Sequence, residues 1–195
     1  MSDKHNDIIN QIIEIELEMF LAVPSRDNSC QKDPKTFRLH RKVQFIPWSD
    51  KTLLSYLNDL NSARLDDRNL MTLKYTLMED SSRIPGPDPL PDPLIEKIVA
   101  CQLEWQKEMF LKYPHIMSRA RPLEKSTSSA AMTSFKTYLE NELKTYSGKT
   151  LSSLYQDITS KQKSSKNMAE ETYELLAQNA GYPSLKEAEK MLSSS

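Results

Sequence analysis

The sequence contains few of the residues from which common nucleotide and metal sites are built. It has three glycines, Gly86, Gly148 and Gly181. Dinucleotide-binding and P-loop motifs need glycines only a few residues apart, so neither motif can be assembled here. The two cysteines, Cys30 and Cys101, form no Cys-x-x-Cys pair, which excludes a thiolate zinc site.

Suitably placed histidines and long apolar runs are also missing. None of the three histidines follows a glutamate by three residues, so the Glu-x-x-His motif of di-iron helical bundles is absent. The most apolar segment, residues 8–23, carries three glutamates and cannot cross a membrane. The N-terminus mixes acidic and basic residues, unlike a signal or transit peptide. We therefore expect a cytoplasmic protein with reduced thiols and no membrane association.

The charges are balanced. Lys and Arg number 26 against 27 Asp and Glu, which gives a net charge of −1. Of the 195 residues, 38% are hydrophobic and 27% are charged, as in globular proteins. Because there is no basic excess to attract nucleic acid or an anionic membrane, we expect neither as a partner.

Helical periodicity dominates the chain. In the first segment Ile9, Ile13, Leu17 and Phe20 fall on one helical stripe. The same periodicity predicts helices at about residues 6–23, 34–46, 50–65, 68–79, 94–113, 132–146, 149–161 and 167–180, with a short last helix after Ser184. The fold class expected from this pattern is all-α.

Individual residues predict where these helices begin and end. Asp33 before Pro34, and Ser49, are suited to N-cap positions. Ser184 begins a capping box, and Gly181 suits the left-handed position after a helix.

A proline-rich segment divides the chain. Residues 85–93 contain five prolines, which exclude a helix or a central strand. We predict a first helical repeat at residues 1–82, a semi-rigid connector at 83–93 and a second helical repeat at 94–195, together in one compact domain.

The two halves match residue by residue. Ten of forty ungapped positions are identical at a separation of 98 residues, where chance gives about two or three. The first-half residues of these ten identical pairs are Phe37, Ser49, Lys51, Thr52, Leu53, Ser55, Asp59, Ser62, Asn69 and Tyr75. The first helix of each half matches at a separation of 90, as Phe20 with Phe110. We therefore expect an array of eight to nine helices from two tandem repeats related by a pseudo-twofold axis.

Paired glutamates are the first candidate for chemistry. Glu14 and Glu18 lie one helical turn apart, and Glu104 and Glu108 repeat the pair. Such carboxylates could act in acid–base catalysis or hold a divalent metal. They could equally border the core and pair with Lys or Arg, which we favour, so we expect no metal site.

A second candidate joins Asp59, Arg68 and Asn69, which recur as Asp157, Lys166 and Asn167. Asn is a good N-cap, and an aspartate ten residues earlier can pair with the cation beside it. Retention in both halves favours a structural brace over an active site, although Asp59 also remains a catalytic candidate.

A third candidate comes from the differences between the halves. His40, Arg41, Gln44 and Lys74 of the first half stand where the second has Tyr138, Leu139, Glu142 and Thr172. This difference is either drift on solvated faces or a cationic site for a carboxylate or phosphate. For an anionic ligand we predict that Arg41, Gln44, Arg68, Asn69 and Lys74 bind it.

Several short motifs resemble those of a family catalogued as domain of unknown function number 4125. They include Glu18-Met-Phe20, Pro34-Lys-Thr-Phe37, Ser55-Tyr56-Leu57-Asn-Asp59-Leu60, Arg68-Asn69-Leu70, Trp105-Gln106, Thr145-Tyr146-Ser147 and Gly181-Tyr182. The resemblance covers nearly the whole chain and implies a helical fold, no assigned reaction and a setting in secondary-metabolite biosynthesis. Asp67 stands where a glycine is expected, so that turn is predicted to differ.

These observations support two functional hypotheses. The first is a cofactor-independent enzyme or accessory protein that acts on a small anionic metabolite, with polar side chains converging in one pocket. The second is a non-catalytic helical protein-interaction module, which would present an exposed apolar groove. Neither the substrate nor the oligomeric state follows from the sequence.

Overall fold

The computed structural model describes residues 3–24, 33–79, 92–124 and 133–194, which form ten helices and no strand. The helices of the first half are α1 (Asp3–Leu21), α2 (Pro34–Phe45), α3 (Asp50–Leu65) and α4 (Leu70–Glu79). Those of the second half are α5 (Pro93–Lys112), α6 (Pro114–Met117), α7 (Phe135–Leu143), α8 (Gly148–Lys163), α9 (Met168–Asn179) and α10 (Leu185–Ser193). The predicted all-α class is confirmed for these residues.

Side-chain caps fix the starts of most helices. Asp33 accepts a hydrogen bond from the backbone N–H of Thr36 at 3.0 Å and so begins α2. Ser49, Ser147 and Ser184 cap α3, α8 and α10 in the same way. These caps satisfy N–H groups that have no partner within the helix.

Two turns use the left-handed backbone conformation without glycine. Asp67, between α3 and α4, has φ 54°, and Ser165, between α8 and α9, has φ 53°. Aspartate tolerates this conformation better than most residues, so the turn forms without the expected glycine. After α9, Gly181 has the expected positive φ of 90°.

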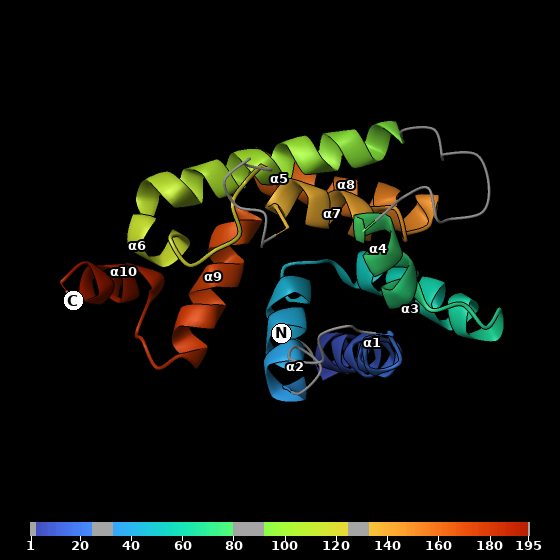
Figure 1. Cartoon of the computed structure of the whole chain (residues 1–195). Coiled ribbons are helices and arrows are strands. Elements are labelled where there is room, and N and C mark those ends of the chain that lie inside the picture. The colour runs from blue at the N-terminus through green and yellow to red at the C-terminus, as the bar shows by residue number, and fades with distance from the viewer. Residues whose placement is uncertain (1–2, 25–32, 80–91, 125–132, 195) are drawn as a thin grey trace.

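The helices of the two halves pack in the same order. In the first half α1 contacts α2, α3 and α4, and in the second α5 contacts α7, α8 and α9. Between the halves α3 packs on α8, α4 on α7 and α2 on α9. Figure 1 shows α5 along one side of the molecule, with α7 and α8 beside it and α1 on the opposite side.

One hydrophobic core joins both halves. Its fully buried members include Ile9 and Leu53 of the first half and Ile98 and Ile158 of the second. A smaller core includes Met109, Met117, Leu185 and Ala188. It lies where α6 packs on α5 and α10 packs on α6 and α9, and Figure 1 shows these helices at one end of the molecule. The shared core fixes the helices that surround the site described below.

The structure corrects three details. The first helix begins at Asp3, earlier than predicted, and the four-residue α6 was not expected. The helix predicted at 132–146 begins later, at Phe135, because Ser134 caps it, and it ends at Leu143. Cys30, most of the predicted connector and Met132 lie outside the described residues. No helix in the described ranges is long and apolar enough to cross a membrane.

Candidate functional site

Arg41 lies at the centre of a buried network of charges. From α2, its Nε donates to Glu16 Oε2 of α1 at 2.7 Å, and its Nη2 donates to Glu16 Oε1 at 2.5 Å. Its Nη1 donates to Glu142 Oε1 of α7 at 2.9 Å. The three residues are 5%, 0% and 3% exposed, so the network ties three helices together in the core.

Lys74 and two tyrosines complete the network. Lys74 Nζ donates to Glu142 Oε2 at 2.7 Å. The Tyr56 hydroxyl donates to Glu16 at 2.7 Å, and the Tyr146 hydroxyl donates to Glu142 at 2.9 Å. Two carboxylates thus face two cations, and the buried charges cancel.

The surroundings of Glu142, Tyr56 and Tyr146 shift their pKa values away from neutral pH. Burial alone would raise the pKa of Glu142, but the charges and hydrogen bonds of Arg41 and Lys74 outweigh it and hold this pKa well below its usual range. Burial and the nearby carboxylates raise the pKa of Tyr56 and Tyr146 well above the ordinary tyrosine value. Glu142 therefore stays ionised and the phenols stay protonated, which suits a structural role better than proton transfer.

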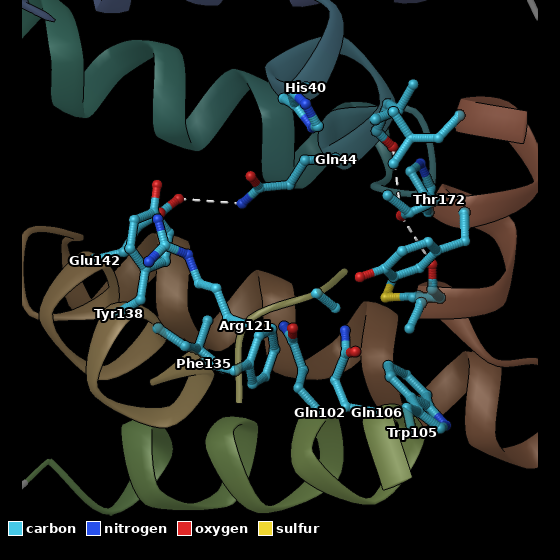
Figure 2. Close-up of a pocket in the computed structure, with 18 of the residues that line it drawn as sticks. His40, Gln44, Gln102, Trp105, Gln106, Arg121, Phe135, Tyr138, Glu142 and Thr172 are labelled. Atoms are coloured by element: carbon cyan, nitrogen blue, oxygen red, sulfur yellow. Dashed lines mark hydrogen bonds between the residues drawn. The ribbon is translucent and has the colours of Figure 1, made fainter. Parts of the chain in front are cut away.

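A cavity of about 550 Å³ opens beside this network. Its walls come from α2, α5, α7 and α9 and from the segment after α6 (Figure 2). Polar groups in its lining belong to His40, Gln44, Gln102, Gln106, Arg119, Arg121, Tyr138, Glu142, Thr172 and Tyr173. Apolar parts of the wall come from Phe135, Leu139, Met168 and Leu176. A volume of this size with a few convergent polar groups is typical of small-molecule sites.

Three carboxamides face the cavity. Gln44 projects from α2, whereas Gln102 and Gln106 stand one turn apart on α5 and point into the hollow from the other side (Figure 2). Gln106 is only 9% exposed, and no described residue hydrogen-bonds its amide. Its amide atoms are not among the buried atoms that lack a partner, so they reach the cavity, where a ligand or water can hydrogen-bond them.

Two arginines give the cavity a positive wall. Arg119 and Arg121 both line it, and neither forms an ion pair with a described carboxylate. Arg121 Nη1 donates to the Thr133 carbonyl at 3.2 Å, and its guanidinium carbon lies 4.8 Å from the centroid of the Tyr138 ring. Both arginines are exposed, and Glu142 is already paired within the network, so these two cations of the lining have no described carboxylate partner.

The predicted binding residues fall in two places. Arg41 and Gln44 line the cavity, and Lys74 lies 3.7 Å from the ring centroid of Tyr138, which also lines it. Arg68 and Asn69 instead border a separate cavity of about 210 Å³. The structure therefore brings Arg41, Gln44 and Lys74 together, and it places Arg68 and Asn69 elsewhere.

Arg68 and Asn69 have local partners. Arg68 pairs with Asp66 at 2.8 Å on the surface. Asn69 Oδ1 accepts from the Thr72 N–H at 2.9 Å, and its Nδ2 donates to the Met19 carbonyl at 2.8 Å. Asn69 thus caps α4 and ties it to the end of α1, as expected of a brace.

Asp59 does not pair with Arg68 as expected. Its Oδ2 accepts from the Ser147 N–H at 3.0 Å, across the molecule at the start of α8. Asp157 accepts from the Ser49 N–H at 2.9 Å at the start of α3. Each aspartate therefore supports the first turn of a helix in the opposite half.

The glutamate candidates lie away from the larger cavity. Glu14 pairs with Arg38 at 2.7 Å, and Glu18 pairs with Arg64 at 3.3 Å, both at the surface. These pairs agree with the alternative that the glutamates border the core. Over the described part of the chain, no three His, Cys, Asp or Glu residues form a group that could hold a metal ion.

Several site residues were missed from the sequence. Glu16 was not singled out from the sequence, although it follows Ile12 by four residues and precedes Phe20 by four on the buried stripe. Gln102 and Gln106 likewise fall on a stripe of α5 whose other members include buried apolar residues. A polar residue in register with a core stripe was the available signal.

Comparison with known proteins identifies a family for the chain, and no function is assigned to that family. No curated protein and no solved structure matches it. The family described as "Protein of unknown function (DUF4125)" matches residues 6–190, nearly the whole chain. The helices that surround the cavity all fall within that range. The chain belongs to this family of unknown function.

Proposed function

We propose that this protein binds a small organic anion in the cavity, as an accessory protein or a cofactor-independent enzyme. The observation that supports this most directly is Gln106, a nearly buried amide that faces the cavity without a partner. Its hydrogen-bonding atoms reach the cavity and are available to a ligand.

The local charge favours an anion. The buried network is neutral, because Arg41 and Lys74 balance Glu16 and Glu142. Arg119 and Arg121 then remain as additional cations in the lining. An anionic ligand would gain from their field, and a cationic ligand would be repelled.

Binding has more support than a chemical step. Glu142 accepts hydrogen bonds from four donors, which leaves it poorly suited to take a proton. His40 is the other titratable group in the lining besides the arginines and tyrosines, and it lies exposed at the rim. These features favour an accessory role, in which the protein binds or presents a metabolite, over catalysis.

The interaction-module alternative has less support. The large exposed apolar side chains of the described residues are Leu21, Leu54, Leu65, Leu111 and Met191, on four different helices. Single exposed apolar residues are normal on a protein surface and do not form a docking groove.

A ligand panel tests the proposal. Isothermal titration calorimetry would compare benzoate, phenylacetate and phenyl phosphate with benzylamine. We expect anions to bind the wild type and benzylamine not to bind. Arg121→Ala should weaken binding of the anions about tenfold, as loss of one charge-assisted contact does. Lys107→Ala is the matched control, since Lys107 is an exposed cation of α5 outside the lining. Absence of binding by every anion contradicts the proposal.

We also propose that the two helical repeats arose by duplication, and that the setting is a cytoplasmic accessory step in secondary-metabolite biosynthesis. The duplication is supported by the matching helix contacts and by the reciprocal bonds of Asp59 and Asp157. A crystal structure tests it, because residues 6–79 should superpose on 94–180 with Asn69 over Asn167. Different helix orders in the two halves would contradict it.

A further inference from the structure

The Arg41–Glu16 pair of the buried network and the cavity beside Gln106 stand at corresponding positions of the two halves. The α1 and α5 residues correspond at a separation of 90, and the later helices correspond at 98. By these separations Glu16 corresponds to Gln106, Arg41 to Leu139, Lys74 to Thr172 and Glu142 to Gln44. At these positions the first half has three charged groups, Glu16, Arg41 and Lys74, and the second half has one, Glu142.

The cavity opens where the second half lacks a large cation. In the first half the Arg41 guanidinium fills the space beside Glu16 and hydrogen-bonds it twice. The corresponding Leu139 and Gln106 both line the cavity, and Leu139 cannot reach the amide with a polar group. Gln106 therefore faces the cavity where the corresponding Glu16 faces the Arg41 guanidinium. Its amide can both donate and accept a hydrogen bond there.

Gln44 presents a donor to that space. Arg41 Nη1 can only donate, so it fixes the Gln44 Oε1 as its acceptor at 2.7 Å. The ionised Glu142 can only accept, so it fixes the Gln44 Nε2 as its donor at 3.1 Å. One N–H of Gln44 remains for a ligand, which must bring an acceptor to it.

We infer that the carboxylate of an organic acid lies between Gln44 and Gln106, in the position that corresponds to the Arg41 guanidinium of the first half. A carboxylate is planar like a guanidinium, and its two oxygens can accept from both carboxamides. The Arg119 and Arg121 charges favour it over a neutral amide. The apolar body of the acid packs on Phe135. This inference rests on the proposed function and names its ligand class.

A variant that copies the first half into the second tests the inference. Leu139→Arg with Gln106→Glu introduces the Arg41–Glu16 pair at the corresponding positions and fills the ligand space. Calorimetry would use benzoate, phenylacetate and 3-phenylpropanoate, each beside its carboxamide. We expect each acid to bind the wild type at least tenfold more tightly than its amide does. The affinity of the double variant for the acids should be at least tenfold lower than that of the wild type. Leu111→Arg, at an exposed position of α5 outside the lining, is the control and should stay within about threefold of the wild type.

The outcomes separate the two proposals. If no acid binds the wild type, the proposed function fails and this inference fails with it. If the acids bind but the double variant binds them equally well, or the amides bind as tightly, only this inference is overturned. Should the double variant not fold, Gln106→Leu decides, because acid affinity unchanged in that variant also overturns the inference.

Discussion

Gln44 on α2 donates a hydrogen bond to Glu142 on α7 at 3.1 Å, although the two residues occupy corresponding positions 98 residues apart. Trp48 and Tyr146 are related in the same way, and their ring centroids lie 6.2 Å apart. Contacts between such pairs are what the proposed duplication about a pseudo-twofold axis predicts for residues near that axis. If both Gln44 and Glu142 were carboxylates, their charges would repel each other. An amide beside a carboxylate avoids this repulsion.

The first prediction concerns the balance of the buried charges. Glu142→Gln should lower the free energy of unfolding by about 3–5 kcal/mol, because it leaves Arg41 and Lys74 buried with one carboxylate between them. Urea denaturation followed by circular dichroism measures this change.

A charge-balanced variant is the control for this prediction. Adding Lys74→Met to Glu142→Gln restores one cation to one carboxylate, so it should recover part of the loss. Lys74→Met alone should be destabilising, and a double-mutant cycle should show clear coupling between the two sites. Additive effects would show that the network is not a unit.

The second prediction concerns acid stability. Arg41 and Lys74, acting against burial, depress the pKa of Glu142 below its ordinary 4.5. A depressed pKa contributes stability that is present above the ordinary value and is lost as the pH falls below it. The wild type should therefore lose more unfolding free energy between about pH 5 and pH 3 than Glu142→Gln with Lys74→Met. Equal losses in urea melts across that range would contradict this origin of acid sensitivity.

The fold was largely predictable from local signals. Periodicity and caps such as Asp33 and Ser49 predicted helices whose starts the structure confirms. These signals act over one or two turns, so a single sequence carries them. The short α6 was missed because its four residues are too few to show a period.

The site was less predictable because it depends on distant partners. Comparison of the halves did single out Arg41, Gln44 and Lys74, which the structure brings together. It did not show that Glu16 and Glu142 already neutralise the two cations, since those pairings join different helices and Arg41 meets Glu142 across 101 residues. Whether the three residues bind a ligand stays a prediction.

The third prediction concerns the two asparagine caps. Asn69→Ala and Asn167→Ala should each lower the free energy of unfolding by about 1 kcal/mol or more, since each side chain caps a helix. Asn69→Ser keeps a capping oxygen and loses the donor to the Met19 carbonyl, so it should cost less than alanine. Thermal melts of the three variants measure this, and unchanged melting temperatures in both alanine variants would remove the structural interpretation.

The fourth prediction compares the two aspartates that support helices across the molecule. Asp157 accepts from the Ser49 N–H and from the Thr52 hydroxyl at 2.6 Å, whereas Asp59 has the Ser147 N–H alone among the bonds described. Alanine at either position should destabilise by about 0.5–2 kcal/mol, with the larger loss at Asp157. Chemical denaturation of both variants measures the order, and a larger loss at Asp59 would contradict it.

The last prediction separates a ligand-binding residue from a structural one. Gln106→Leu replaces a buried amide that has no described partner with an apolar side chain of similar size, so the ligand-free protein should keep its stability or gain up to about 1 kcal/mol. Gln44→Leu should instead destabilise by about 1–3 kcal/mol, because it removes bonds to Arg41 and Glu142 in the buried network. Urea melts without ligand measure both changes. A large loss in Gln106→Leu would mean that this amide supports the fold and is not held open for a ligand.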